Sequence, residues 1–315
     1  MFYQICLVIK KRAKCEKERS KNPRLNCLFL SSVFAMFQTC SFRTRRIFEM
    51  PENEDDLEGK SLVFVTDFGT IRRNSAKDFW NIKSNGKISI DLKGDNGAPR
   101  GHLVSVILTD ESKDILIATE QGHSCRSPVA DLRVFNSRKS VGVKGITLAP
   151  GNKVISASDL NHVDFNANER NAYNAGGSTS IKDGDSEINF VLSAERMKEM
   201  KDSEETLLTV SSLGFCKRSS AHDYRVTSRG GKGIMAANIN VQTGSLVACF
   251  PVKDDDGLIL TTDGGQTIRT RVSEMRQSGR MTKGVKAFKL PAGQKIVGVA
   301  LSSDDVDDEL DASAE

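Results

Sequence analysis

Arginine recurs at one fixed place in four segments of the sequence. Each segment reads as an apolar run, a turn that ends in glycine, and a basic strand. The turn glycine and the arginine four positions later are, in the four segments, Gly69 and Arg73, Gly122 and Arg126, Gly214 and Arg218, and Gly265 and Arg269. Guanidinium groups repeated on solvent-facing strands would match the regularly charged backbone of duplex DNA. We therefore expect a basic outer rim that binds DNA, with Arg72 and Lys217 adding charge. The alternative is that these positions are solvated and only protect strand edges.

A second candidate is the glycine-rich stretch within Ser228–Gly233. Its glycines, Gly230, Gly231 and Gly233, permit positive φ and a close approach of backbone to a ligand. Arg229 and Lys232 add positive charge, so this turn could press against phosphates. The spacing does not satisfy the phosphate-binding loop GxxxxGK[ST]. The alternative is an ordinary glycine-rich loop between strands.

The elements that must position these side chains are short strands. The turn glycines are 53, 92 and 51 residues apart, so the middle interval is one repeat plus an insertion. A second glycine opens a further apolar run in each repeat, at Gly86, Gly142, Gly233 and Gly284. Two repeats continue into another strand, at 149–158 and 291–300. Periods near 50 with several strands each indicate propeller blades. We predict an all-β, propeller-like array of four blades over 51–301.

Three segments match no repeat. Residues 1–50 carry 11 basic and 3 acidic side chains, and the tail 302–315 carries 7 acidic and no basic ones, so we expect the tail to be disordered. The insertion at about 161–204 is polar. Within it, we expect 175–187 to be flexible and Ser193–Glu205 to form a short helix.

Composition argues against several classes of function. Aromatic residues are 6% of the chain, which is too few for a stacking platform for single strands. The seven cysteines form no CxxC and the four histidines are scattered, so neither a zinc site nor a catalytic triad is indicated. Asp254–Asp256 fits a solvated turn better than a metal site. The apolar run 25–37 is too short to span a bilayer, and free thiols suggest a reducing cytosol.

The repeats resemble the C-terminal domain of the DNA gyrase A subunit. The resemblance lies in LVFVTDFGTIRRNSAKDFWNIKSNGKISIDL (62–92), the segment 115–156, GFCKRSSAHDYRVTSRGGKGIMAANI (214–239) and the segment 247–300. It implies a β-pinwheel, in which neighbouring blades exchange strands and a basic rim wraps duplex DNA. It also implies assembly of two A with two B subunits, a bacterial cytoplasmic and nucleoid location, and no contact with a membrane. ATP and Mg would be bound by the B subunit, so we expect no cofactor in this chain.

The sequence departs from the family in two places. The family box Gln-Arg-Arg-Gly-Gly-Lys/Arg-Gly is matched at Arg229, Gly230, Gly231, Lys232 and Gly233 but not at the two preceding residues, and it lies in the third repeat instead of the first. The family domain has six blades and follows a region with a catalytic tyrosine. Tyr3, Tyr173 and Tyr224 lack that sequence context, so we expect no DNA cleavage by this chain alone.

Three alternatives remain at this level. The array could be a protein-interaction platform that does not bind DNA. It could be the equivalent domain of the topoisomerase IV A subunit, which the nearly complete box and the acidic tail disfavour. It could also be a truncated remnant that does not fold stably.

Overall fold

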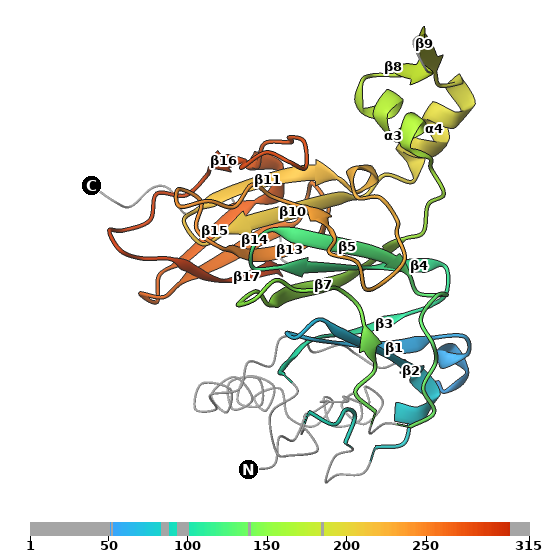
Figure 1. Ribbon diagram of the computed structural model, residues 1–315. Helices are drawn as coiled ribbons and strands as arrows, with labels where there is room; N and C mark the ends of the chain where they lie inside the picture. The colour runs from blue at the N-terminus through green and yellow to red at the C-terminus, as the bar shows by residue number, and fades with distance from the viewer. Residues whose placement is uncertain are drawn as a thin grey trace, which may run out of the picture.

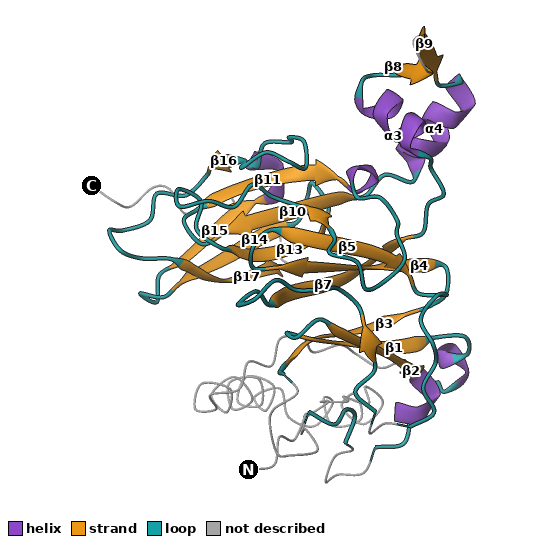
Figure 2. Cartoon of the chain, viewed as in Figure 1, coloured by secondary structure: helices purple, strands orange, loops and turns teal. Residues whose placement is uncertain are grey.

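Four successive β-sheets follow one another along the chain and stack as blades (Figures 1 and 2). The computed structural model describes residues 51, 53–82, 88–92, 101–137, 140–183 and 186–302. The predictions made for residues 1–50 and for the tail after Ser302 lie outside the described residues. Within them, the all-β, four-blade prediction is confirmed.

Each blade contains three antiparallel strands, with the first strand in the middle. A tight turn joins the first strand to the second, and a longer segment leads to the third. The strands are β1 (Ser61–Thr66), β2 (Thr70–Ser75) and β3 (Leu103–Thr109) in blade 1; β4 (Lys113–Thr119), β5 (His123–Pro128) and β7 (Val154–Asn161) in blade 2; β10 (Thr206–Ser211), β11 (Phe215–Ser220) and β13 (Leu246–Val252) in blade 3; and β14 (Gly257–Thr262), β15 (Thr267–Arg271) and β17 (Ile296–Ser302) in blade 4. Short 3-10 helices occupy Asp55–Leu57, Ala76–Phe79, Ala221–Asp223 and Val272–Glu274.

A short strand from each following blade completes the sheet before it. The exchanged strands are β6 (Val143–Lys144), β12 (Ile234–Met235) and β16 (Val285–Lys286), which pair with β2, β5 and β11. This exchange is the pinwheel feature that the family resemblance implied. A fourth such strand, expected from Gly86 onward, is not present in its described part, Ile88–Leu92. The described residues contain no blade before β1 that could accept it.

Gly233 shows why a glycine opens each exchanged strand. Its φ is +76°, and a Cβ there would lie 2.4 Å from the carbonyl oxygen of Ser124 on β5. Backbone therefore meets backbone at this point, and any side chain would push β12 away from the sheet that receives it.

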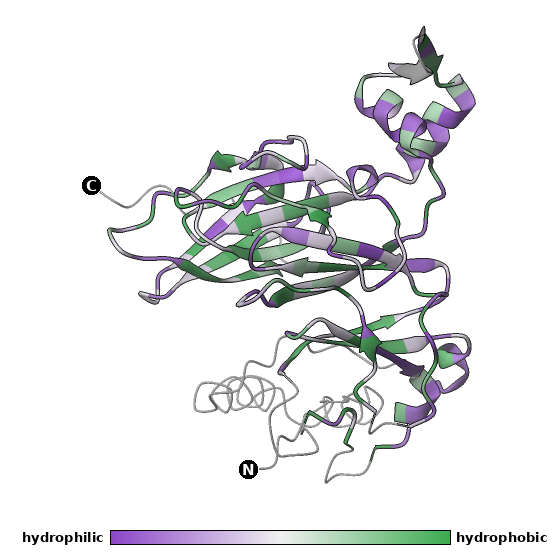
Figure 3. Ribbon diagram, viewed as in Figure 1, coloured by the Kyte–Doolittle hydropathy of each residue, from purple (hydrophilic) through white to green (hydrophobic). Residues whose placement is uncertain are grey.

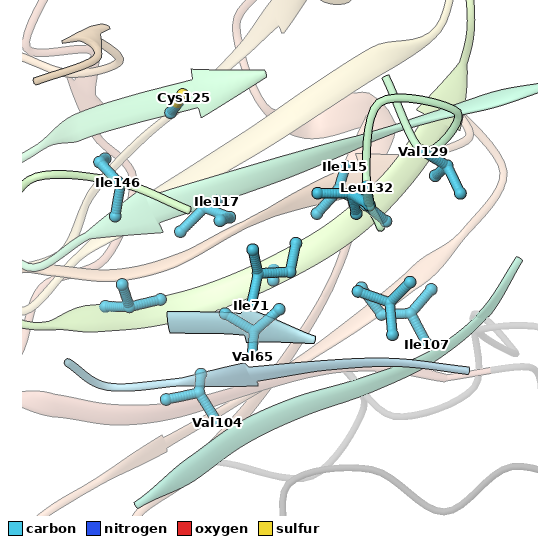
Figure 4. Packing of buried hydrophobic residues seen from close by; sticks show 13 residues of the cluster. Val65, Ile71, Val104, Ile107, Ile115, Ile117, Cys125, Val129, Leu132 and Ile146 are labelled. Carbon is cyan, nitrogen blue, oxygen red and sulfur yellow. The ribbon is translucent and has the colours of Figure 1, made fainter. Parts of the chain in front are cut away.

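Three hydrophobic clusters of the described residues lie between neighbouring blades, so these blades stabilise each other. The cluster between blades 1 and 2 combines Val63 and Ile71 with Ile115 and Ile117, and Ile146 from the segment after β6 packs among them (Figure 4). Similar clusters lie between blades 2 and 3 and between blades 3 and 4. Figure 3 shows the hydrophobic residues concentrated on the strands. No single blade buries both of its faces alone.

The insertion forms a separate lobe of two helices and a hairpin beside blade 3 (Figure 1). It contains α3 (Ala167–Asn174), β8 (Ser178–Asp183), β9 (Ser186–Val191) and α4 (Ala194–Asp202). The predicted helix after Ser193 is confirmed. The stretch 175–187, expected to lack regular structure, instead forms most of the hairpin. Gly176 and Gly177 make the turn from α3 with positive φ, and Phe190 of β9 packs against the lobe's small core.

Candidate nucleic-acid interface

The recurrent arginines do not face solvent in the first three blades. Arg73 is 4% exposed and Arg126 is 2% exposed, and the side chain of Arg218 is 14% exposed. The expectation of solvent-facing guanidinium groups at these positions is therefore wrong. Each of these side chains points toward the following blade and is covered by it. Arg269 is exposed, and no blade follows β17 among the described residues.

Arg73 shows what the buried guanidinium contacts. Its Nη1 donates to the carbonyl oxygens of Val129, at 3.0 Å, and Leu132, at 3.3 Å, in the turn after β5 of blade 2. Nε donates to Ser61 Oγ at 2.9 Å, and Nη2 pairs with Glu111 at 2.6 Å. One side chain thus connects its own blade to the next.

Arg126 repeats this arrangement with a buried ion pair added. Its Nη1 donates to the carbonyl oxygens of Ala221, at 2.9 Å, and Tyr224, at 3.4 Å, in blade 3. Nε pairs with Asp114 at 2.7 Å, and Asp114 is fully buried. Nη2 donates to the carbonyl oxygen of Asn161 at 2.7 Å.

Arg218 makes the same connection to blade 4. Its Nε donates to the carbonyl oxygen of Met275 at 2.7 Å, and Nη1 pairs with Asp254. At all three interfaces, one acceptor is a backbone carbonyl of the following blade that lies six residues after that blade's own strand arginine. These carbonyls belong to Leu132, Tyr224 and Met275. In the first two interfaces the carbonyl three residues after that arginine is a second acceptor. We call Arg73, Arg126 and Arg218 the clamp arginines.

The two basic residues that precede clamp arginines are also buried. Arg72 is 1% exposed and donates to the carbonyl oxygen of Ser140 at 2.8 Å. Lys217 is 1% exposed, and its Nζ donates to the carbonyl oxygens of Gly279, at 3.1 Å, and Thr282, at 2.9 Å. Burial lowers the pKa of Lys217 to about 8. Both side chains hold the next blade, and neither forms part of a solvent-facing rim.

A second repeated arginine does face solvent. It stands seven residues after the strand arginine of its own blade and is exposed at Arg133, Arg225 and Arg276. We call these three the rim arginines. The same place in blade 1 holds Trp80. Within the described residues none of the three forms an ion pair with a carboxylate. Sequence reasoning missed them, although their constant spacing from the first arginine was a usable signal.

The box loop, Arg229–Gly233, lies beside the rim arginine of blade 3. Its backbone is fixed on blade 2, because Gly230 N donates to the carbonyl oxygen of Gly145 at 2.7 Å and Gly231 accepts from Thr147 N at 2.8 Å. The side chains of Arg229 and Lys232 are exposed. Arg225, Lys232 and Gly231 line a shallow polar pocket of about 320 Å³. The structure therefore brings the predicted loop together with an arginine that was not predicted.

Lysines extend this positive surface around the exchanged strands. The exposed lysines are Lys144 in β6, Lys286 in β16, and Lys283 and Lys289 on either side of β16. Lys232 and Lys283 occupy equivalent places, each just before the glycine that opens an exchanged strand. We call these exposed lysines, together with the rim arginines and the exposed side chains of the box loop, the basic rim. It spans blades 2 to 4.

The described part of the chain contains no group of three or more histidine, cysteine or acidic side chains arranged to hold a metal ion. The turn at Asp254–Asp256 has a local role: Asp256 accepts from Lys253 N at 2.7 Å, and Asp254 pairs with Arg218. None of the described helices is both long and apolar enough to cross a membrane.

Comparison with known proteins agrees with this architecture. A family model described as the DNA gyrase C-terminal domain, a β-propeller, matches residues 60–110, 113–161, 205–253 and 258–303, which are the four blades without the insertion. The chain is 41% identical over 269 residues to the DNA gyrase A subunit of Rickettsia bellii, an alignment that covers 83% of this chain and 29% of the relative. It is 31% identical over 258 residues to the same protein of Staphylococcus aureus (strain MRSA252), covering 82% and 24%.

Solved structures show the same fold. A DNA gyrase A C-terminal domain superposes with a TM-score of 0.57 at 18% identity, covering 84% of this chain and 74% of that one. The C-terminal domain of a DNA topoisomerase IV also gives 0.57, at 16% identity, covering 77% and 62%. The chain spans under a third of the length of the curated relatives described above. With the family model matched over all four blades, the chain belongs to the DNA gyrase C-terminal domain family.

Proposed function

We propose that the chain binds and wraps duplex DNA through the basic rim, as the wrapping part of a gyrase A subunit. The observation that carries this proposal is the exposed arginine at one repeat position in three consecutive blades, Arg133, Arg225 and Arg276. A duplex presents phosphates continuously along its axis, so a cation repeated blade by blade can follow it. Such contacts do not read base sequence.

The box loop adds a close backbone approach to these contacts. Gly230 and Gly231 place little bulk between Arg229 and Lys232, so a phosphate could reach the backbone at this turn. The loop is fixed at its base by hydrogen bonds to blade 2, and its geometry is therefore set before DNA arrives.

The curated relatives described above are gyrase A proteins, and this likeness supports a proposal about the wider role of the chain. We infer that the chain acts with gyrase A and B subunits, in an assembly of two of each, to introduce negative supercoils. In this scheme ATP and Mg are bound by the B subunits, and this chain holds no cofactor and supplies only DNA contacts. We also propose that the chain acts in the bacterial cytoplasm with the nucleoid.

The test is a filter-binding titration of duplex DNA at several salt concentrations. We expect the logarithm of affinity to fall linearly with the logarithm of salt concentration. Each lost phosphate contact should make the slope shallower by about 0.9. The combined variant Arg133→Ala, Arg225→Ala and Arg276→Ala should therefore lose up to about 2.7 of slope.

A matched control removes three positive charges elsewhere. Lys198 and Lys201 on α4, in the insertion, and Lys253 before β14 are exposed and do not belong to the basic rim. The variant Lys198→Ala, Lys201→Ala and Lys253→Ala should keep the parent slope. Equal losses in both variants would show that net charge alone drives binding. Binding that does not respond to salt would favour the protein-interaction alternative.

A further inference from the structure

We propose that the clamp arginines are positioning residues, which fix where the rim arginine of the following blade stands and thereby set the curvature of the wrapped DNA. This inference rests on the proposed function, because it takes the rim arginines as the phosphate contacts. It assigns the buried arginines a role in the shape of the complex instead of a direct contact.

The backbone of each clamp arginine holds the segment that carries the next rim arginine. The carbonyl oxygen of Arg126 accepts from Thr227 N at 2.9 Å, two residues after the rim residue Arg225. The equivalent bonds run from Phe135 N to Arg73 at 2.8 Å and from Ser278 N to Arg218 at 2.8 Å. In addition, the residue directly after each rim arginine forms a parallel bridge to the clamp residue.

The side chain of each clamp arginine holds the other side of the same segment. Its guanidinium donates to the carbonyl directly before the rim arginine. The three acceptors are Leu132 at 3.3 Å, Tyr224 at 3.4 Å and Met275 at 2.7 Å. The rim arginine therefore stands between two points that the preceding blade fixes.

The remaining donors of the guanidinium hold its own blade. They contact the end of the third strand or the loop after it, at Glu111 for Arg73, at the carbonyl of Asn161 (the last residue of β7) for Arg126, and at Asp254 for Arg218. A planar guanidinium offers five donors in fixed directions, whereas a lysine ammonium is a flexible point charge. The bridge between two blades therefore fixes an angle as well as a distance.

DNA resists bending, so the protein must hold its own shape against the duplex. With the clamp intact, successive rim arginines are presented at one repeated angle. With the clamp loosened, the same charges would remain, but the array would yield and the DNA would straighten. A variant with a loosened clamp should therefore bend the bound DNA less while it keeps its phosphate contacts.

The experiment uses the full chain, a nicked plasmid and DNA ligase, and measures the change in linking number per bound protein. The variants Arg73→Lys, Arg126→Lys and Arg218→Lys, alone and combined, keep the positive charge but remove the planar guanidinium with its five donors. We expect the linking-number change of the combined variant to fall to about half or less. We expect the salt slope of binding to remain that of the parent.

A second pair of variants covers the case in which a lysine at these positions prevents folding. Glu111→Gln and Asp254→Asn remove carboxylates that hold Arg73 and Arg218 and are themselves 64% and 74% exposed. Arg73 and Arg218 keep their hydrogen bonds to backbone carbonyls of the following blade in these variants. Glu199→Gln, on the exposed face of α4, is the control for loss of one negative charge. The paired variant should lower the linking-number change, and the control should not.

Each outcome decides the question. A parent-like linking-number change in all folded clamp variants would overturn the positioning role. A salt slope reduced as in the rim variant would also overturn it, because the clamp arginines would then contact DNA. Loss of salt-dependent binding in the parent itself would instead refute the proposed function.

Discussion

The amide nitrogen of Thr227 donates to the carbonyl oxygen of Arg126 at 2.9 Å, across 101 residues of chain. The guanidinium of Arg126 reaches the same turn of blade 3 through Tyr224. Between these two contacts stands the exposed Arg225. The same relationship recurs at the other two blade interfaces, so the solvent-facing charge of one blade depends on a buried charge in the blade before it.

Loss of Arg126 should destabilise the array strongly. Arg126→Ala leaves Asp114 buried without its guanidinium partner, and breaking such a pair costs about 3–5 kcal/mol. Urea denaturation followed by circular dichroism measures this cost. Arg133→Ala is the control, because substitution of an exposed side chain changes stability by about 0.5 kcal/mol or less. Equal stabilities of the two variants would contradict the clamp.

The box glycines should respond differently to alanine. Gly233→Ala puts a Cβ at positive φ and 2.4 Å from the carbonyl oxygen of Ser124, so we expect a lower melting temperature and a loss of about 1–3 kcal/mol. Gly231→Ala is its matched control, because the nearest atom to the added Cβ is 3.9 Å away. A melting temperature of Gly233→Ala equal to that of the control would show that β12 does not need this glycine.

Lys217 should give stability a positive dependence on pH. Its pKa is lowered by burial to about 8 from 10.5, so between these values the unfolded chain binds more protons than the folded one. Stability should rise with pH across this window, by at most about 1.4 kcal/mol per unit. The buried Cys216 and Cys249, with pKa values raised to about 12 from 9, act in the opposite direction above pH 9.

The comparison that isolates Lys217 is the parent against Lys217→Met. Both chains retain the two cysteines, so the difference between their urea stabilities removes the cysteine contribution. As the pH is raised from 7.5 to 9, the free energy of unfolding of the parent should increase relative to that of Lys217→Met. A difference that is constant with pH would mean that Lys217 titrates normally.

The buried thiols should be unreactive in the folded chain. Burial raises the pKa of Cys216 and Cys249 to about 12, so at pH 8 the thiolate fraction is on the order of one in ten thousand. Iodoacetamide labelling with peptide mass spectrometry should modify both residues only after denaturation. Labelling of the native chain at the rate of a free peptide would show that these blade interfaces open readily.

His222 should hold the inserted lobe on blade 3. Its ring lies edge-on to Phe165 at 5.1 Å and to Tyr173 at 5.4 Å, and Nε2 lies 2.7 Å from the carbonyl oxygen of Met200. His222→Ala should speed hydrogen exchange across α3 and α4 while leaving β10 protected. Slow exchange in both helices of the variant would show that the lobe is held by other contacts.

The sequence predicted the blades because turn glycines and apolar runs recur at a constant spacing. Gly69, Gly122, Gly214 and Gly265 all adopt positive φ, as the turns require. The insertion and its second helix were also predictable. The hairpin of β8 and β9 was missed because its polar, glycine-containing sequence resembles that of a flexible loop.

Burial of the clamp arginines was beyond sequence reasoning. An arginine on a strand is usually solvent-facing, and only the following blade turns that face of the sheet into an interior. Arg126 is buried because the carbonyl of Ala221, 95 residues away in blade 3, accepts its hydrogen bond, in addition to the carboxylate of Asp114 in its own blade. The rim arginines could have been found from the same repeat by looking seven residues further on.

The most direct test of DNA wrapping maps the rim arginines along bound DNA. Arg133→Cys, Arg225→Cys and Arg276→Cys, each carrying a photo-crosslinker, are bound to a duplex of defined sequence, and the crosslinked nucleotides are identified. We predict three crosslinks that follow one another along the duplex in the order 133, 225 and 276. Crosslinks that are absent at all three positions, or that fall at one place on the DNA, would contradict a duplex path along the basic rim.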